Sequence, residues 1–200
     1  MKATPKDWSD VTIAQYYNLC EAIEMDWNDD TDKAIAMLSA LSGIPIKVLN
    51  EEVPAKKLIK AINDIKFITE AKPKGYAKSI LRIGRRRFRV DLMIKNSTAS
   101  NFISLTEYTK SNDIAKINIH NIMSIFCHEI NWFGFKKKRT VHSQREIAEY
   151  LKANLTMDKA FIYSGFFLKS WKALSKAMLD YSDLQIKKVM KIIKKEVPNS

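Results

Sequence analysis

Hydrophobic side chains recur at helical spacing through the first third of the chain. Thr12 and Gln15 have the types and spacing of a capping box, in which the threonine caps a helix and the glutamine reaches back to it. The spacing of the apolar residues that follow predicts an amphipathic helix, with Trp8 packed over its first turn. This apolar stripe consists of Ile13, Tyr16, Tyr17, Leu19, Cys20 and Ile23.

Further helices are expected before the middle of the chain. One begins near Asp30 and ends at Gly43, because glycine favours the left-handed conformation that closes a helix, and Pro45 lies just beyond it. A short helical turn is expected over residues 47–50. Pro54 suits the first turn of the next helix, since proline there loses no intrahelical hydrogen bond.

The convincing strand pattern lies between residues 79 and 92. Leu81 and Ile83 alternate with Ile80, Arg82 and Gly84, and residues 88–92 alternate apolar with charged, which is the period of a half-buried strand. Gly84-Arg85 lies between these runs and predicts a two-residue hairpin turn. Because a lone hairpin is marginal in water, we expect it to pack on helices or on the sheet of a neighbouring chain. Residues 71–78, which include a proline and a glycine, are the best linker candidate.

Helical spacing returns in the second half of the chain. Ser143 is expected to cap a helix there, with Glu146 three residues later as its capping-box partner. The expected elements are helices over residues 98–110 and 113–127, a loop over 128–141, and helices over 143–154, 156–179 and 183–196.

These elements predict a mainly α fold with one β-hairpin (α+β), arranged as two helical halves around a central basic hairpin. The expected parts are an N-terminal helical part (1–70), a linker with the hairpin (71–97) and a C-terminal helical part (98–200). A chain of 200 residues, 46% of them hydrophobic, buries enough surface to fold without disulfides or a structural metal. We therefore expect the three parts to form one compact unit.

The net charge of +12 is distributed unevenly. Residues 1–32 contain eight carboxylates against two lysines, a net charge of −6, which leaves +18 on residues 33–200. A basic protein suggests nucleic acid as a partner. An acidic head on a basic body also suits head-to-body contacts between copies, which close into rings when the rotation permits. The candidate acidic interface consists of Asp7, Asp10, Asp26, Asp29 and Asp30.

Residues that would carry a reaction are not evident. Cys20 and Cys127 lie in apolar helical contexts and suggest buried thiols in a reducing compartment. His120 and Cys127 share one face of a predicted helix, beside His128, but without the spacing of a metal site. The sequence contains no glycine-rich phosphate loop and no nucleophile elbow. We expect no catalytic residue, metal, cofactor or enzymatic activity and, because the apolar runs are far shorter than a bilayer span, no membrane partner.

Two basic clusters are the candidate interaction sites, and the first lies in the hairpin. The planar guanidinium of arginine suits phosphate or carboxylate groups. This cluster therefore has three interpretations: contact with packaged DNA or RNA, an ion pair with the acidic segment of another copy, or a solvated hairpin tip. It consists of Arg85, Arg86, Arg87 and Arg89.

The second cluster places aromatic residues beside cations. Such aromatics stack on bases in nucleic-acid proteins, anchor in a neighbour's pocket in assembly proteins, or fold back onto the protein's own core. No helix-turn-helix, zinc-finger or RNA-binding strand signature accompanies either cluster, which weakens the nucleic-acid interpretation. The second cluster consists of Trp132, Phe133, Phe135, Lys136, Lys137, Lys138 and Arg139.

The order of these segments resembles small tail-region proteins of tailed phages that infect Bacteroidetes, including crAss-like phages. Each motif is short, and the similarity lies in their succession from about residue 7 to 180. The chain departs from the family pattern at Ser100-Asn101, where Gly-Gln is typical, and at Arg86, where lysine is usual. The matching segments are the Trp-x-Asp-hydrophobic-Thr start at 8–12, the helix at 36–43, the hairpin at 83–90, the helix start at 98–105, and the segments 156–160 and 165–167.

The resemblance implies a structural protein of a phage tail, a subunit of an oligomeric ring or barrel between portal and distal tail. Its expected partners are copies of itself, other tail or portal proteins and, non-specifically, packaged DNA. Its expected location is the virion tail, after synthesis in the host cytoplasm. A tail assembly chaperone that is not retained in the virion is the alternative within the same family. A small basic nucleic-acid-binding protein is the alternative of another class.

Overall fold

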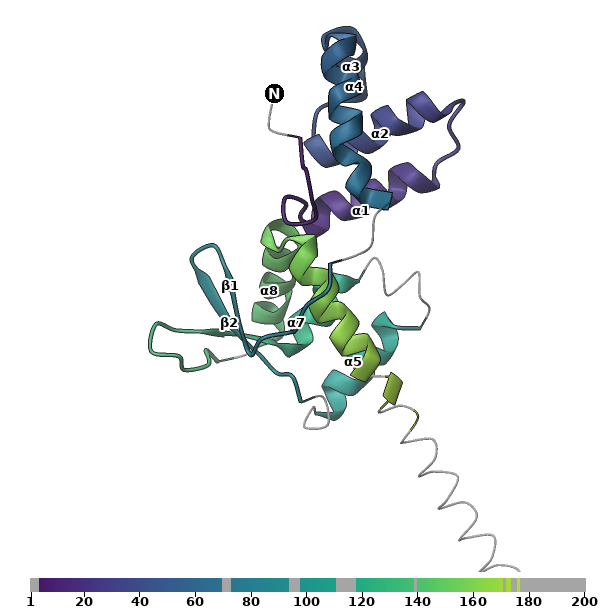
Figure 1. The fold of residues 1–200 in the computed structure, drawn as a ribbon. Coiled ribbons are helices and arrows are strands. Elements are labelled where there is room, and N and C mark those ends of the chain that lie inside the picture. The colour runs from purple at the N-terminus through teal and green to yellow at the C-terminus, as the bar shows by residue number, and fades with distance from the viewer. Residues whose placement is uncertain are drawn as a thin grey trace, which may run out of the picture.

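The protein is mainly helical with a small antiparallel sheet, which is the α+β class that the sequence pattern predicts. Figure 1 shows the N-terminal helices at one end and the sheet with the C-terminal helices at the other. The computed structural model describes residues 4–69, 73–93, 98–110, 118–138, 140–170, 172–173 and 176.

Local signals set the boundaries of the N-terminal helices. The predicted capping box is confirmed, because Gln15 N–H donates to the Thr12 hydroxyl (3.3 Å) and Thr12 N–H donates to Gln15 Oε1 (2.9 Å). Gly43 ends the second helix at φ +69°, a left-handed conformation that glycine adopts without strain. The helices are α1 (Ile13–Glu24), α2 (Asp30–Ser42), α3 (Ile46–Glu51) and α4 (Ala55–Asp64), followed by a 3₁₀ helix (Ile65–Thr69).

One hydrophobic core joins the two helical groups. The buried Trp8 ring meets Phe67 and Phe161 edge-on, with centroid distances of 5.2 and 5.0 Å. Phe161 lies in a helix over residues 157–170, so this contact spans most of the chain. Met157 N–H donates to Val11 O (2.7 Å) beside it. The aromatic packing and this main-chain bond hold the N-terminal helices against the C-terminal group.

Within the residues that the structure describes, the sheet has three strands where the sequence pattern predicts two. The Gly84-Arg85 turn is as predicted, with Gly84 at φ +54°. The third strand corrects the prediction, because Cys127 was expected to end a helix and the residues after it to form a loop. Helix α7 (Ile119–Phe126) ends one residue earlier, and Cys127 pairs with Val90. The strands, in spatial order, are β1 (Ile80–Ile83), β2 (Arg86–Val90) and β3 (Cys127–Ile130).

The helix after the third strand, α8 (Val141–Asn154), begins earlier than predicted. Thr140 is its N-cap, because Ser143 N–H donates to the Thr140 hydroxyl (3.0 Å) and Thr140 N–H donates to Ser143 Oγ (2.8 Å). Ser143 is therefore the partner in the capping box and not the cap. The predicted partner Glu146 instead lies 3.7 Å from His142 Nε2.

The C-terminal helices cover one face of the sheet, and the predicted linker is fastened to them. Helix α5 (Ala99–Tyr108) packs on α7, and the ring of Tyr150 in α8 lies 5.9 Å from that of Phe88 in β2. Lys78 N–H donates to Tyr163 Oη (3.1 Å), whose hydroxyl donates to Lys78 O (2.9 Å). The predicted lysine-rich helix over 183–196 and most of the predicted helix beyond 170 lie outside the described residues.

Candidate interaction surface

A tight turn after β3 carries the aromatic residues of the second cluster. Asn131 N–H donates to Phe135 O (3.0 Å) and Gly134 N–H donates to Asn131 O (3.0 Å). The Asn131 side chain accepts from Phe135 N–H (2.9 Å), and Gly134 supplies a positive φ of +87°. After the turn, Lys137 N–H donates to Glu129 O (2.9 Å), so the chain returns along the strand. Residues 131–138, here called the aromatic finger, are thus held by their own main chain.

The aromatic side chains of the finger project into solvent. Trp132 is 80% exposed, Phe133 81% and Phe135 71%. The interpretation in which this segment folds back onto the protein's own core is therefore wrong. Several large exposed aromatics within one short segment are typical of interaction sites, and the role of this segment stays a prediction.

The cations of the finger differ in what they contact. Lys136 Nζ lies 3.4 Å from Asp91 Oδ2, and Lys137 Nζ lies 2.7 Å from Glu129 Oε1. Lys138 is exposed at the edge of a gap between the sheet and α8. Arg139 lies outside the described residues. Two of the four predicted cations are therefore partly neutralised within the chain.

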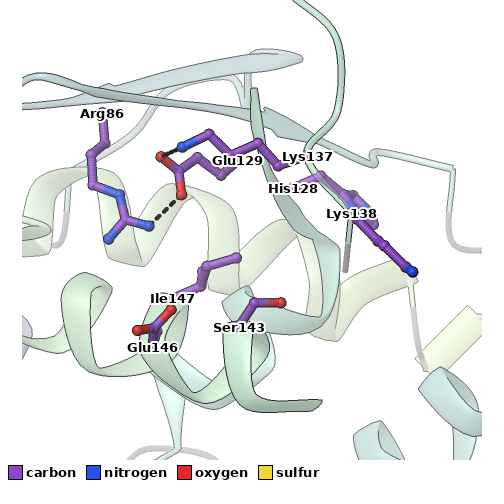
Figure 2. Close-up of a pocket in the computed structure, with 8 residues that line it drawn as sticks. All are labelled: Arg86, His128, Glu129, Lys137, Lys138, Ser143, Glu146 and Ile147. Atoms are coloured by element: carbon purple, nitrogen blue, oxygen red, sulfur yellow. Dashed lines mark hydrogen bonds and ion pairs between the residues drawn. The ribbon is translucent and has the colours of Figure 1, made fainter. Parts of the chain in front are cut away.

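Arg86 lies on the inner side of the sheet, and its side chain is 29% exposed. Its guanidinium forms an ion pair with Glu129, and its Cζ lies 4.4 Å from the centroid of the Tyr150 ring. The Tyr150 hydroxyl donates to Ile83 O (2.9 Å), which fixes that ring against the hairpin. Figure 2 shows Glu129 between Arg86 and Lys137. Arg86 thus fastens the hairpin to β3 and α8 within the chain, and its role at an interface stays a prediction.

The two cations around Glu129 change its titration. Burial alone raises the pKa of Glu129, but the hydrogen bonds and charges of Arg86 and Lys137 outweigh it and hold the pKa below the ordinary value. The carboxylate therefore stays charged at neutral pH. A gap of about 220 Å³ opens beside this group. It is lined by Arg86, His128, Glu129, Lys137, Lys138, Ser143, Glu146 and Ile147 (Figure 2).

The other arginines of the hairpin lie on its outer side. Side chains alternate along a strand, so Arg87 and Arg89 face away from the buried Phe88. Arg87 Nη1 donates to Trp132 O (3.3 Å), which links the strand to the base of the finger. Arg85 is exposed in the turn. Arg82 was not among the predicted site residues. It is exposed and lies directly opposite Arg87, so the same alternation of side chains identifies it once the strand register is known.

The predicted acidic interface divides into two sites. Asp7 accepts from Ser9 N–H (2.7 Å), and Asp10 accepts from Lys6 N–H (3.0 Å), so both shape the turns before α1. The hydrogen bonds from Ser9 hold the pKa of Asp7 below its ordinary value. The other site lies beyond the far end of α1, about 18 Å of helix away.

This second acidic site surrounds the loop between α1 and α2. Asp29 caps α2 by accepting from Asp32 N–H (2.7 Å), and Asp30 lies in the first turn of that helix. The loop forms an open hollow of about 520 Å³. Its lining combines carboxylates with the half-exposed Met25, and consists of Met25, Asp26, Trp27, Asn28, Asp29, Asp30 and Lys33.

His120 is part of the core and does not join Cys127 in a shared site. Its Nδ1 lies 2.8 Å from the Tyr17 hydroxyl. Burial, with a smaller contribution from Lys152, lowers the pKa of His120 and keeps the ring neutral. Cys127 begins β3, so the predicted common helical face is wrong. Across the ranges that the structure describes, no group of three histidine, cysteine or carboxylate side chains is placed to hold a metal.

Comparison of the chain with protein-family models, curated proteins and solved structures finds no match. Among the described helices, none is both long enough and apolar enough to cross a bilayer.

Proposed function

We propose that this protein is a structural subunit of a phage tail, part of an oligomeric ring or barrel between portal and distal tail. The observation that carries the proposal is the aromatic finger, which holds three large aromatic side chains in solvent on a hydrogen-bonded turn. The order of the sequence motifs supports the phage assignment. The finger supports the mechanism, which is docking into another protein molecule.

A rigid aromatic finger is suited to a protein partner. Fully burying one such side chain is worth about 1.5–3 kcal/mol. Because the main-chain bonds of Asn131 already order the turn, little conformational entropy remains to be lost on docking. Aromatic side chains at the centre of an interface, with charged groups at its rim, are the arrangement found at binding hot spots.

The chain itself offers a surface with complementary charge. The hollow at the α1–α2 loop exposes Met25 beside the carboxylates of Asp26 and Asp30. Methionine sulfur packs favourably on aromatic rings, and the carboxylates suit the lysines of the finger. The loop between α1 and α2, which forms the hollow, and the segment just before α8, which forms the finger, lie on opposite sides of the molecule (Figure 1). A contact between them is head-to-tail, and repeated copies close into a ring when the rotation from one copy to the next permits.

Two surface variants test this contact. In Trp132→Ser/Phe133→Ser/Phe135→Ser the finger loses its apolar surface, and in Asp26→Lys/Asp30→Lys the charge of the hollow is reversed. Tyr76→Ser is the matched control, because Tyr76 is 95% exposed and lies outside both surfaces. Oligomer size is measured by sedimentation velocity over a range of protein concentrations.

The native chain and the Tyr76 control are expected to form a discrete oligomer, and each surface variant alone is expected to remain monomeric. A mixture of the two variants should form a heterodimer and nothing larger, because each supplies the surface that the other lacks. A native chain that stays monomeric at all concentrations contradicts self-assembly. An oligomer that survives the finger variant contradicts the role of the finger.

A tail assembly chaperone remains the second candidate within the same family. The exposed finger also suits a transient contact with a tail-tube or tape-measure protein. Recovery of the protein from infected cells but not from purified particles would favour this alternative.

A further inference from the structure

The outer face of the sheet concentrates arginine side chains. The register pairs Arg82 of β1 with Arg87 of β2, and Arg89 follows two residues after Arg87 on the same strand. Residues directly opposite each other share a face of an antiparallel sheet, and so do residues two apart on one strand. Arg82, Arg87 and Arg89 therefore lie together on the face opposite the buried Leu81, Ile83 and Phe88, with Ile130 and His128 of β3 beside them. This surface is called the arginine face.

The charges of the arginine face are poorly compensated. Like charges directly opposite each other destabilise a sheet, and Arg82 and Arg87 are such a pair. Within the part of the chain that the structure describes, neither Arg82 nor Arg89 has an ion-pair partner, and the hydrogen bond of Arg87 goes to a main-chain carbonyl. Asp91, at the end of β2, already contacts Lys136 (3.4 Å) and His128 (3.5 Å). An anion bound across the face would relieve the repulsion.

The chemistry of the face selects the class of anion. A protein partner needs an apolar centre to bury, but here Ile80 is the exposed large hydrophobic residue, at 46%, while Ile130 is only 4% exposed. Guanidinium groups bind phosphate oxygens with two parallel hydrogen bonds. Neighbouring strands lie about 4.8 Å apart and alternate residues about 6.8 Å apart, so the three arginines span a few consecutive phosphates. The net charge of +12 attracts polyanions over a longer range.

We propose that the arginine face binds the phosphate backbone of nucleic acid, without reading its sequence. The arginine face adjoins the base of the aromatic finger through Arg87, but phosphate binding by the three arginines does not require the proposed docking between copies. Single-stranded and duplex nucleic acid present the same phosphates. Only a single strand also offers unstacked bases to Trp132, whose carbonyl accepts from Arg87 at the edge of the face.

Fluorescence anisotropy with labelled DNA of random sequence tests the proposal. Single strands and duplexes of equal length are titrated with the full chain at several salt concentrations. The variant is Arg82→Gln/Arg87→Gln/Arg89→Gln, and the matched control is Lys56→Gln/Lys57→Gln/Lys60→Gln, which removes the same charge from the exposed side of α4. A lysine variant, Arg82→Lys/Arg87→Lys/Arg89→Lys, keeps the charge if the glutamine variant fails to fold.

The native chain should bind with an affinity that falls steeply with salt. On duplex DNA the arginine-to-glutamine variant should reduce the steepness of log K against log salt by up to about 2.7, and on single strands by about 2.1. The α4 control, which replaces Lys56, Lys57 and Lys60, should change it much less. The charge-keeping variant should retain the native slope. A preference for single strands that disappears with Trp132→Ser would identify single strands as the source of the phosphates.

Three results would overturn the proposal. One is the absence of salt-dependent binding by the native chain. Another is an equal loss in the arginine variant and the α4 control, which would mean that only net charge matters. The third is a loss of self-association in the arginine variant with DNA binding unchanged, which would assign the face to the carboxylates of another copy. The first two results leave the proposed docking of the aromatic finger untouched, because its own variants test it separately.

Discussion

Replacing Arg86 by alanine tests whether this residue stabilises the fold, and Arg85→Ala, at the exposed neighbour, is the comparison. Arg86 pairs with Glu129, and their side chains are 29% and 17% exposed. It also lies over the Tyr150 ring at 4.4 Å. Arg85, its neighbour in the turn, is exposed and has no ion-pair partner among the described residues. The two substitutions remove the same charge at adjacent positions and differ in the contacts that are lost.

The expected cost follows from the burial of the pair. An exposed ion pair contributes about 0–1 kcal/mol, and breaking a fully buried one costs about 3–5 kcal/mol. This partly buried pair lies between these limits, at about 1–2 kcal/mol, and the cation–π contact adds about 0.5–2 kcal/mol. We expect Arg86→Ala to lower the free energy of unfolding by about 2–3 kcal/mol and Arg85→Ala by less than about 0.5 kcal/mol.

Urea denaturation followed by far-ultraviolet circular dichroism at neutral pH measures both effects. The difference between the native chain and Arg86→Ala should shrink in acid. The pKa of Glu129 is lowered in the folded state, so the stability from this pair is present above the ordinary glutamate pKa and is lost as pH falls through the lowered value. Equal midpoints for the two arginine variants at neutral pH would refute the structural role of Arg86.

Three further predictions concern the fold. Thr140→Ala should cost about 1 kcal/mol of unfolding free energy because it removes the N-cap of α8, and Glu146→Ala should cost less than half as much; equal costs in urea denaturation would contradict the observed cap. The pKa of His120 is lowered, so the unfolded chain binds a proton that the folded chain excludes, and stability should fall as pH drops below the ordinary histidine pKa. His120→Gln should weaken that dependence when denaturation is compared at pH 7.5 and 5.5, and an unchanged pH profile would count against it. Gly84→Ala should cost about 1–2 kcal/mol, since alanine is strained at φ +54° and its Cβ would lie 3.3 Å from the Tyr150 hydroxyl; an unchanged melting temperature would show that the turn adapts.

Local sequence signals predicted much of the fold. Thr12 with Gln15, Gly43, and Gly84-Arg85 each act within a few residues, so their outcome does not depend on distant parts of the chain. The start of α8 was misplaced because Thr140 with Ser143, and Ser143 with Glu146, both have the spacing of a capping box. Local pattern alone does not choose between two overlapping signals of the same kind.

The third strand shows what local pattern misses. Residues 119–130 form one continuous run that includes many apolar residues, and a helix is compatible with its spacing through Cys127. What makes Cys127–Ile130 a strand is pairing with β2, nearly 40 residues earlier in the chain. This pairing also places Glu129 beside Arg86, which gives that arginine an ion-pair partner within the chain. The role of each arginine therefore depended on a strand that the periodicity did not reveal.

The candidate sites also combine what the sequence predicts with what only the folded structure shows. Sequence composition located the aromatic and basic residues, but three interpretations of Trp132, Phe133 and Phe135 were equally compatible with it. Only the turn after β3 shows that these side chains project outward. Asp7 and Asp30 both belong to the acidic segment 1–32, but they lie beyond opposite ends of α1. The acidic segment therefore forms two sites and not one.

Quantitative mass spectrometry of purified phage particles tests the central claim most directly. A permanent ring subunit predicts that the protein is present in every particle at a fixed copy number, a multiple of the symmetry of the tail. Particles produced when only the finger variant is expressed should lack this protein. Absence from native particles, with the protein abundant in infected cells, would contradict the structural role and leave the chaperone as the better account.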